Sequence, residues 1–148
     1  MTSGGLYVAF QAVGEGPRDL LLVDQWFSHM DAMWDVPPLA SLVEGLASFS
    51  RVITFDERGI GESDPLPMRA LPTLEEWIDD QRAVMDAIGV KRAALVAGLG
   101  AGFMAIVFAA THPERVSALV LVNCFARFGR APGYPWGATP EEQAQRTE

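Results

Sequence analysis

The chain has 148 residues, of which 49% are hydrophobic and 20% charged, a composition typical of one globular domain. Its formal net charge of −8 disfavours nucleic acids and anionic membranes as partners, because both attract basic surfaces. No apolar run approaches the roughly 20 residues of a membrane-spanning helix, and the N-terminus shows no secretory signal. One cysteine cannot form an internal disulfide, so we expect a cytoplasmic protein.

Short apolar runs bounded by turn residues alternate along the chain with segments of helical spacing. Strands are predicted over 6–13, 20–23, 51–55, 92–97 and 116–122, and helices over 39–48, 74–88 and 103–111. Thr73 and Glu76 have the spacing of a capping box at the start of the second helix. This alternation predicts βαβ units and a mostly parallel sheet, and the continuously apolar later strands predict helices on both of its faces.

The residues Gly98-Leu99-Gly100-Ala101-Gly102 stand between a predicted strand and a predicted helix. This is the setting of a nucleophile elbow, G-x-S-x-G, with Gly100 in place of the serine. We expect Gly98 and Gly102 to be required by the backbone or by close packing. We expect Gly100 to relieve the strain that a serine would bear in this turn.

Several segments follow the order found in α/β-hydrolases. The run Leu20–Trp26 resembles the family's strand and oxyanion loop, Asp56-Glu57-Arg58-Gly59-Ile60-Gly61-Glu62-Ser63 resembles its D-x-R-G-x-G-x-S loop, and 98–102 resembles its elbow. Residues 111–116 resemble the link to the next strand. The likeness covers about residues 6–137 and corresponds to the N-terminal half of the family. Residues 46–51 and 134–137 are similar, more narrowly, to hydrolase-like domains upstream of class III nucleotide cyclase domains.

The resemblance implies a three-layer α/β sandwich whose C-terminal strands and lid are missing. We expect a partial hydrolase-fold domain over 1–126 and the start of a lid-like or disordered tail over 127–148. The backbone amides of Trp26 and Ala101 would form the oxyanion hole. The family's acid and histidine have no counterpart in this chain, and no cofactor is implied.

These features predict a catalytically inactive hydrolase-like protein with a binding or regulatory role. One alternative is an active hydrolase or esterase that uses an atypical nucleophile (Ser28, Ser63 or Cys124) or residues from a partner chain. Another is a structural dimerisation module. If the strand 116–122 is an uncovered edge, it would pair with a second copy or with a missing C-terminal segment. Pro132, Pro135 and Pro140 make the tail a poor covering strand.

The remaining candidate residues have plain structural interpretations beside the functional ones. The loop of Asp56, Arg58, Gly59, Gly61 and Ser63 is expected to be braced by an Asp56–Arg58 charge pair, with Ser63 bonded inside its own turn. Trp26, Phe27, His29, Met33 and Trp34 either line a pocket for a small hydrophobic ligand or simply cover the core. We expect Cys124 to be a buried, inert thiol and His112 to lie near the last helix carbonyls. Two histidines and one cysteine form no recognisable metal motif.

Overall fold

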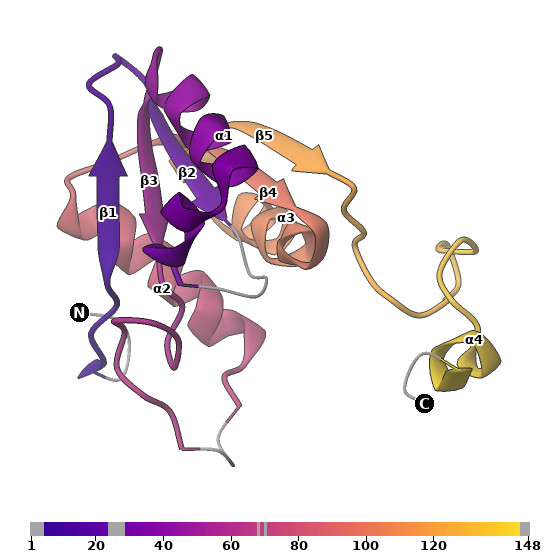
Figure 1. Cartoon of the computed structure of the whole chain (residues 1–148). Helices are drawn as coiled ribbons and strands as arrows, with labels where there is room; N and C mark the ends of the chain where they lie inside the picture. The colour runs from indigo at the N-terminus through magenta and orange to yellow at the C-terminus, as the bar shows by residue number, and fades with distance from the viewer. Residues whose placement is uncertain (1–4, 24–28, 68, 70, 146–148) are drawn as a thin grey trace.

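The computed structural model describes residues 5–23, 29–67, 69 and 71–145. Within them lies a sheet of five strands in the order β1-β3-β2-β4-β5 (Figure 1). The strands are β1 (Phe10–Val13), β2 (Asp19–Val23), β3 (Arg51–Phe55), β4 (Ala93–Gly98) and β5 (Val116–Val122). β1 is antiparallel to β3, and every other neighbouring pair is parallel, so the prediction of a mostly parallel sheet is confirmed.

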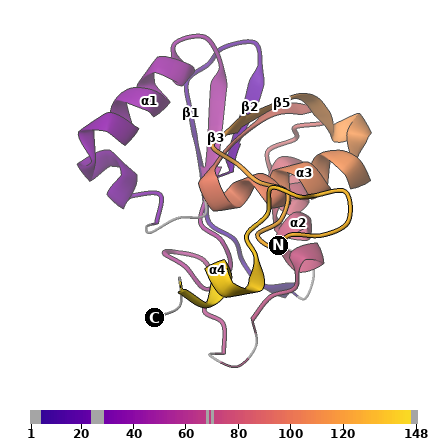
Figure 2. The ribbon, with the colours of Figure 1, turned by 90° about the vertical axis from the view of Figure 1, so that its right-hand side faces the viewer.

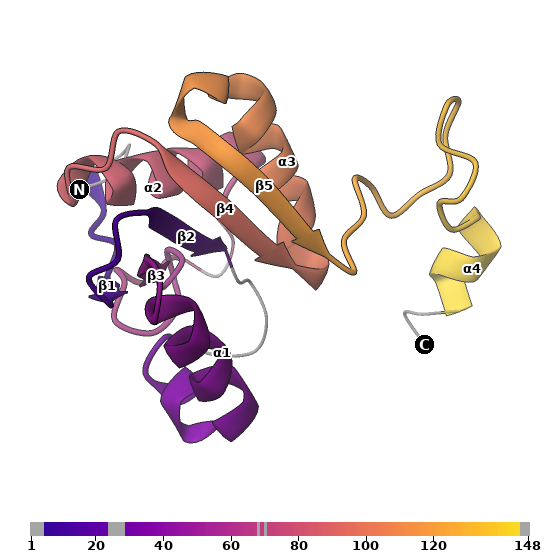
Figure 3. The ribbon, with the colours of Figure 1, turned by 90° about the horizontal axis from the view of Figure 1, so that it is seen from above.

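Helices cover the two faces of the sheet unequally. Figures 2 and 3 show α1 (Pro37–Ala47) on one face, and α2 (Leu74–Ala87) and α3 (Gly102–Thr111) on the other. Short 3-10 helices lie at Ala32–Asp35 (η2), Leu99–Ala101 (η3) and Pro113–Arg115 (η4). The predicted capping box is present at the start of α2, where Glu76 N–H donates to Thr73 Oγ1 at 3.3 Å and Thr73 N–H donates to Glu76 Oε2 at 2.8 Å.

Two apolar cores follow from this layering. Because successive strand residues point to opposite faces, Leu21 enters the core under α2 and α3, while Leu20 enters the core under α1. Met104 and Phe108 of α3 are fully buried in the first core, and Val43 of α1 is fully buried in the second. The strand–helix alternation of the sequence therefore gives the expected three layers.

β5 is the uncovered edge of the sheet. Its Leu119 lies opposite Leu95 and its Val120 opposite Val96, so the two side chains belong to different faces, and both are exposed. The prediction that helices cover both faces of the later strands is wrong for β5, because the side chains of both its faces are left exposed. The expectation of an uncovered edge is confirmed for the part of the chain that the structure describes.

Residues 123–145, here called the arm, lead away from β5 and the sheet (Figures 1 and 3). The arm ends in α4 (Pro140–Gln145), a helix that was not predicted from the sequence. Thr139 and Glu142 form a second capping box, with Thr139 N–H donating to Glu142 Oε2 at 2.7 Å and Glu142 N–H donating to Thr139 Oγ1 at 3.2 Å. Among the described residues, no helix has the length and apolarity needed to cross a membrane.

Candidate functional site

The turn between β4 and α3 carries its backbone strain on Leu99. Leu99 has a φ of 49°, in the left-handed region, and its side chain is 48% exposed. Gly100, the next residue, is buried and has no such φ. A left-handed conformation costs an L-residue about 1–2 kcal/mol, and leucine has no polar group to compensate. The expectation that Gly100 relieves the strain of this turn is therefore wrong.

The other two elbow glycines differ in what the structure requires of them. A Cβ on Gly102 would overlap the Cβ of Cys124 and lie 2.5 Å from its Sγ, so glycine allows the first turn of α3 to approach the chain after β5. This confirms the packing role expected for Gly102. Gly98 has a φ of −114° and open space around its Cβ position, so nothing here requires glycine at 98.

The charged partner of Arg58 is Asp80 of α2 rather than Asp56. Arg58 Nε and Nη2 donate to the two carboxylate oxygens of Asp80 at 2.7 and 2.6 Å, and the two side chains are 2% and 1% exposed. Arg58 Nη1 also lies 3.2 Å from Glu76 Oε1. The Asp80 carboxylate raises the pKa of the Arg58 guanidinium above its ordinary value. The predicted Asp56–Arg58 pair is wrong, because α2 packs against the loop and its Asp80 supplies the carboxylate that pairs with Arg58.

Asp56 holds the loop to its neighbours through backbone amides. Its Oδ1 accepts from Met30 N–H at 2.6 Å, and its Oδ2 accepts from Glu62 N–H at 3.0 Å. Gly61 has a φ of 54°, and a Cβ there would overlap the Asp56 carboxylate. The Asp56 carboxylate thus fastens the segment after β2 to the loop after β3.

Ser63 is bonded within this loop, as predicted. Its Oγ donates to the Asp56 carbonyl at 2.6 Å and accepts from Ala9 N–H at 2.9 Å. Because the hydroxyl proton is engaged and the side chain is buried, Ser63 is a structural residue in this fold.

The residues predicted to line a pocket after β2 do not share one environment. Trp26, Phe27 and Ser28 lie outside the described residues, so the oxyanion role of Trp26 and the nucleophile alternative at Ser28 stay predictions. Met33 is buried in the core under α1, and Trp34 packs against that core. His29 is exposed. Met33 and Trp34 therefore cover the core.

Two further candidates lie near α3. Cys124 is half-buried rather than buried, and its Sγ lies 3.3 Å from the carbonyl oxygens of Ala97 and Val122. The ring of His112 stacks on Phe108 at 5.0 Å, and its Nδ1 lies 2.8 Å from Thr111 Oγ1. Its backbone N–H donates to the Phe108 carbonyl at 2.8 Å, so His112 lies near the last carbonyls of α3, as expected. The described part of the chain holds no group of three or more His, Cys, Asp or Glu side chains that could bind a metal ion.

The strand–turn–helix geometry and the sheet order agree with the comparison to known proteins. A sequence model described as the alpha/beta hydrolase fold matches residues 20–147. The chain belongs to the alpha/beta hydrolase fold family. Members of this family similar to the chain include the RutD protein of Caulobacter vibrioides, a candidate carbamate hydrolase by its name. RutD is 31% identical over 129 residues, which cover 85% of this chain and 45% of RutD.

Solved structures of the alpha/beta hydrolase fold give the same result. A hydrolase from Pseudomonas aeruginosa PA01 superposes with a TM-score of 0.74 at 29% identity, covering 86% of this chain and 46% of that protein. A thermophilic esterase from Thermogutta terrifontis superposes with a TM-score of 0.71 at 28% identity, covering 89% and 46%. The chain thus spans about half the length of these alpha/beta hydrolase fold relatives.

Proposed function

We propose that this hydrolase-fold chain does not hydrolyse esters by nucleophilic attack from its elbow, and that it acts by binding. The observation that carries the proposal is Leu99, an apolar residue at the strained position of the turn between β4 and α3. In this fold the nucleophile sits on a strained strand-to-helix turn with its side chain exposed. Leu99 meets each of those conditions, and its side chain carries no oxygen or sulfur atom.

The strain at Leu99 moves the nucleophile position of the elbow from Gly100 to Leu99. Placing the nucleophile position at Leu99 makes the motif Ala97-Gly98-Leu99-Gly100-Ala101, one residue earlier than the frame centred on Gly100. The oxyanion donor from the elbow is the amide after the nucleophile, so Gly100 rather than Ala101 would supply it. Neither frame contains serine, and a longer polypeptide with this elbow would also lack a nucleophilic atom there.

The alternative of an atypical nucleophile has less support. The Ser63 hydroxyl is committed to Asp56 and Ala9, and the Cys124 thiol is half-buried against two carbonyl oxygens. In the described part of the chain, the hydrogen-bond partners of Ser63 and Cys124 are backbone groups and include no base. Nucleophilic catalysis needs a base beside the nucleophile.

The decisive experiment measures the hydrolysis of p-nitrophenyl acetate and butyrate by the wild-type chain and by a Leu99→Ala variant. We expect equal rates, no saturation with substrate, and only a slight excess over buffer. Saturable turnover that disappears in a Ser28→Ala, Ser63→Ala or Cys124→Ala variant would contradict the proposal. A family esterase serves as the positive control for the assay.

We further propose a regulatory setting for the binding role, in a polypeptide that also carries a nucleotide cyclase domain. The support is the likeness of residues 46–51 and 134–137 to hydrolase-like domains upstream of such cyclases. An antibody raised against this chain, used on its source cells and followed by peptide mass spectrometry, tests the setting. Cyclase peptides in a band heavier than 16.0 kDa are expected, and a band without them would contradict this setting.

A second candidate function is self-association through β5. Val116–Val122 contains no charged residue, although exposed edges are usually protected by charge or proline, and Val120 and Val122 are about half exposed. We propose that two copies pair along β5. Sedimentation equilibrium should show a dimer that Val120→Lys dissociates and that Leu42→Lys, an exposed apolar site on α1, leaves intact. A wild-type monomer at high concentration would contradict pairing.

A further inference from the structure

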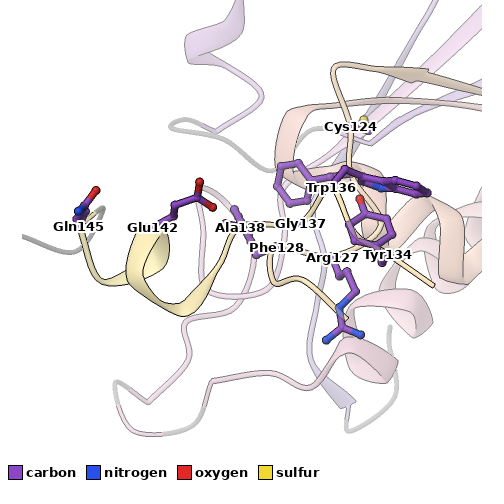
Figure 4. Close-up of a pocket in the computed structure, with 10 residues that line it drawn as sticks. Cys124, Arg127, Phe128, Tyr134, Trp136, Gly137, Ala138, Glu142 and Gln145 are labelled. Atoms are coloured by element: carbon purple, nitrogen blue, oxygen red, sulfur yellow. The ribbon is translucent and has the colours of Figure 1, made fainter. Parts of the chain in front are cut away.

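The arm contains a cavity of about 790 Å³ (Figure 4). Its lining comes entirely from residues after β5, between Cys124 and Gln145. None of these residues belongs to the elbow turn or to the Asp56–Ser63 loop. The volume falls within the range of roughly 300–1,000 Å³ that small-molecule sites occupy.

Aromatic rings dominate the cavity wall. The rings of Phe125 and Phe128 lie 4.3 Å apart, and those of Tyr134 and Trp136 lie 4.9 Å apart in an edge-on arrangement. Trp136 is 71% exposed and Phe128 is 56% exposed, although rings of this size are usually covered. Exposed rings gathered around one concavity favour a flat apolar ligand that can stack on them.

The only cation in the lining is without a partner in the part of the chain that the structure describes. Arg127 makes no ion pair or hydrogen bond there, whereas Glu142 accepts from Thr139 N–H at 2.7 Å and Tyr134 Oη accepts from Ala126 N–H at 3.2 Å. Figure 4 shows the Arg127 side chain beside Tyr134, with its guanidinium on the side away from Cys124. A free guanidinium matches a carboxylate by two parallel hydrogen bonds and repels a cationic ligand.

The arm's own backbone contacts give the cavity its shape. Isolated bridges join Gly129 to Ala138 and Ala131 to Tyr134. A Cβ on Gly137 would lie 2.5 Å from the Gly129 backbone, so the two passes of the arm touch closely. At the other end, Cys124 packs on Gly102 of α3. A site organised before the ligand arrives loses less affinity to ordering on binding.

We propose that the arm binds a planar aromatic carboxylate, whose ring stacks among the aromatic side chains while Arg127 pairs with the carboxylate. This names the ligand class for the binding role and rests on that part of the proposed function. The ligand proposal and the proposal of an inactive elbow can be refuted independently. Ester turnover is measured without this ligand, and ligand binding is measured without turnover.

Isothermal titration calorimetry on the full chain tests the site with 2-naphthoate and its neutral analogue 2-naphthalenemethanol. We expect 2-naphthoate to bind more tightly, and Arg127→Gln to weaken it about tenfold or more while leaving the alcohol unchanged. Trp136→Leu should weaken both compounds. Arg18→Gln, which removes the same charge far from the arm on an exposed side chain, should change neither.

Three results would overturn the proposal. The first is no saturable binding of either compound, and the second is 2-naphthoate binding that Arg127→Gln leaves unchanged. The third is tighter binding of 1-naphthylmethylammonium than of 2-naphthoate, which would identify the cavity as a cation site. Circular dichroism of each variant checks that the fold is retained, and a conservative Arg127→Lys variant should recover part of the affinity through its charge.

Discussion

The strain at Leu99 can be measured by comparing two substitutions at that position. Leu99→Ala removes the side chain beyond the Cβ atom. Leu99→Gly also removes the Cβ, which is the atom that disfavours a left-handed backbone. Relief of the left-handed conformation is worth about 1–2 kcal/mol, and the added chain entropy of glycine costs about 0.5–1 kcal/mol. Leu99→Gly should therefore be more stable than Leu99→Ala by roughly 0.5–1 kcal/mol.

The loss of the leucine side chain affects both variants equally and cancels in this comparison. Leu99 is 48% exposed, so its removal costs about 1 kcal/mol, half of the value for a fully buried side chain. Leu99→Ala should fall below wild type by that amount, and Leu99→Gly should lie close to wild type. Urea denaturation followed by circular dichroism gives the three free energies of unfolding.

The matched control is Ala83→Gly in the middle of α2, where the backbone is helical. There the same alanine-to-glycine change should destabilise by about 1 kcal/mol, the opposite sign. If Leu99→Gly is less stable than Leu99→Ala by a similar amount, the turn is not strained at 99. The assignment of Leu99 to the nucleophile position would then fall with it.

Asp80→Asn should lower the free energy of unfolding by about 3–5 kcal/mol in urea denaturation, because it leaves the buried Arg58 without its main counter-charge; a loss below 1 kcal/mol would contradict that pairing. Gly102→Ala should destabilise by about 1–3 kcal/mol through overlap with Cys124, and Cys124→Ala in the same chain should recover part of the loss. The pKa of Glu141 is lowered by its own backbone amide at the start of α4 and by Thr139, so its contribution is present above its unfolded pKa and lost as pH falls through the folded pKa. NMR titration of the Glu141 carboxyl should show a midpoint below that of an unstructured peptide, and an ordinary midpoint would contradict the contact.

Much of the site depended on how α2 packs, which its sequence only partly indicates. Asp80 lies one helical turn before Val84 and is buried, as are Ile78 and Met85 of the same helix. An acid on a buried stripe requires a cation, so a partner for Asp80 could have been predicted. Which arginine supplies it depends on the placement of α2 against the loop after β3. Asp56 is closer to Arg58 in sequence than Asp80 is. The prediction relied on that closeness and therefore named the wrong partner.

The sequence by itself determined the elements whose stabilising contacts are local. Strand alternation, the Thr73–Glu76 cap and the order of βαβ units depend on residues a few positions apart, and each was predicted. α4 was not predicted although Thr139 and Glu142 have the same capping spacing, because the glycines and prolines that precede this short helix are typical of irregular structure. The tertiary structure alone decided which elbow residue is strained, since residues 97–102 accommodate two overlapping frames and only the dihedral at Leu99 separates them. It also decided the exposure of both faces of β5 and the gathering of aromatic rings in the arm, because these depend on where whole elements lie rather than on neighbours along the chain.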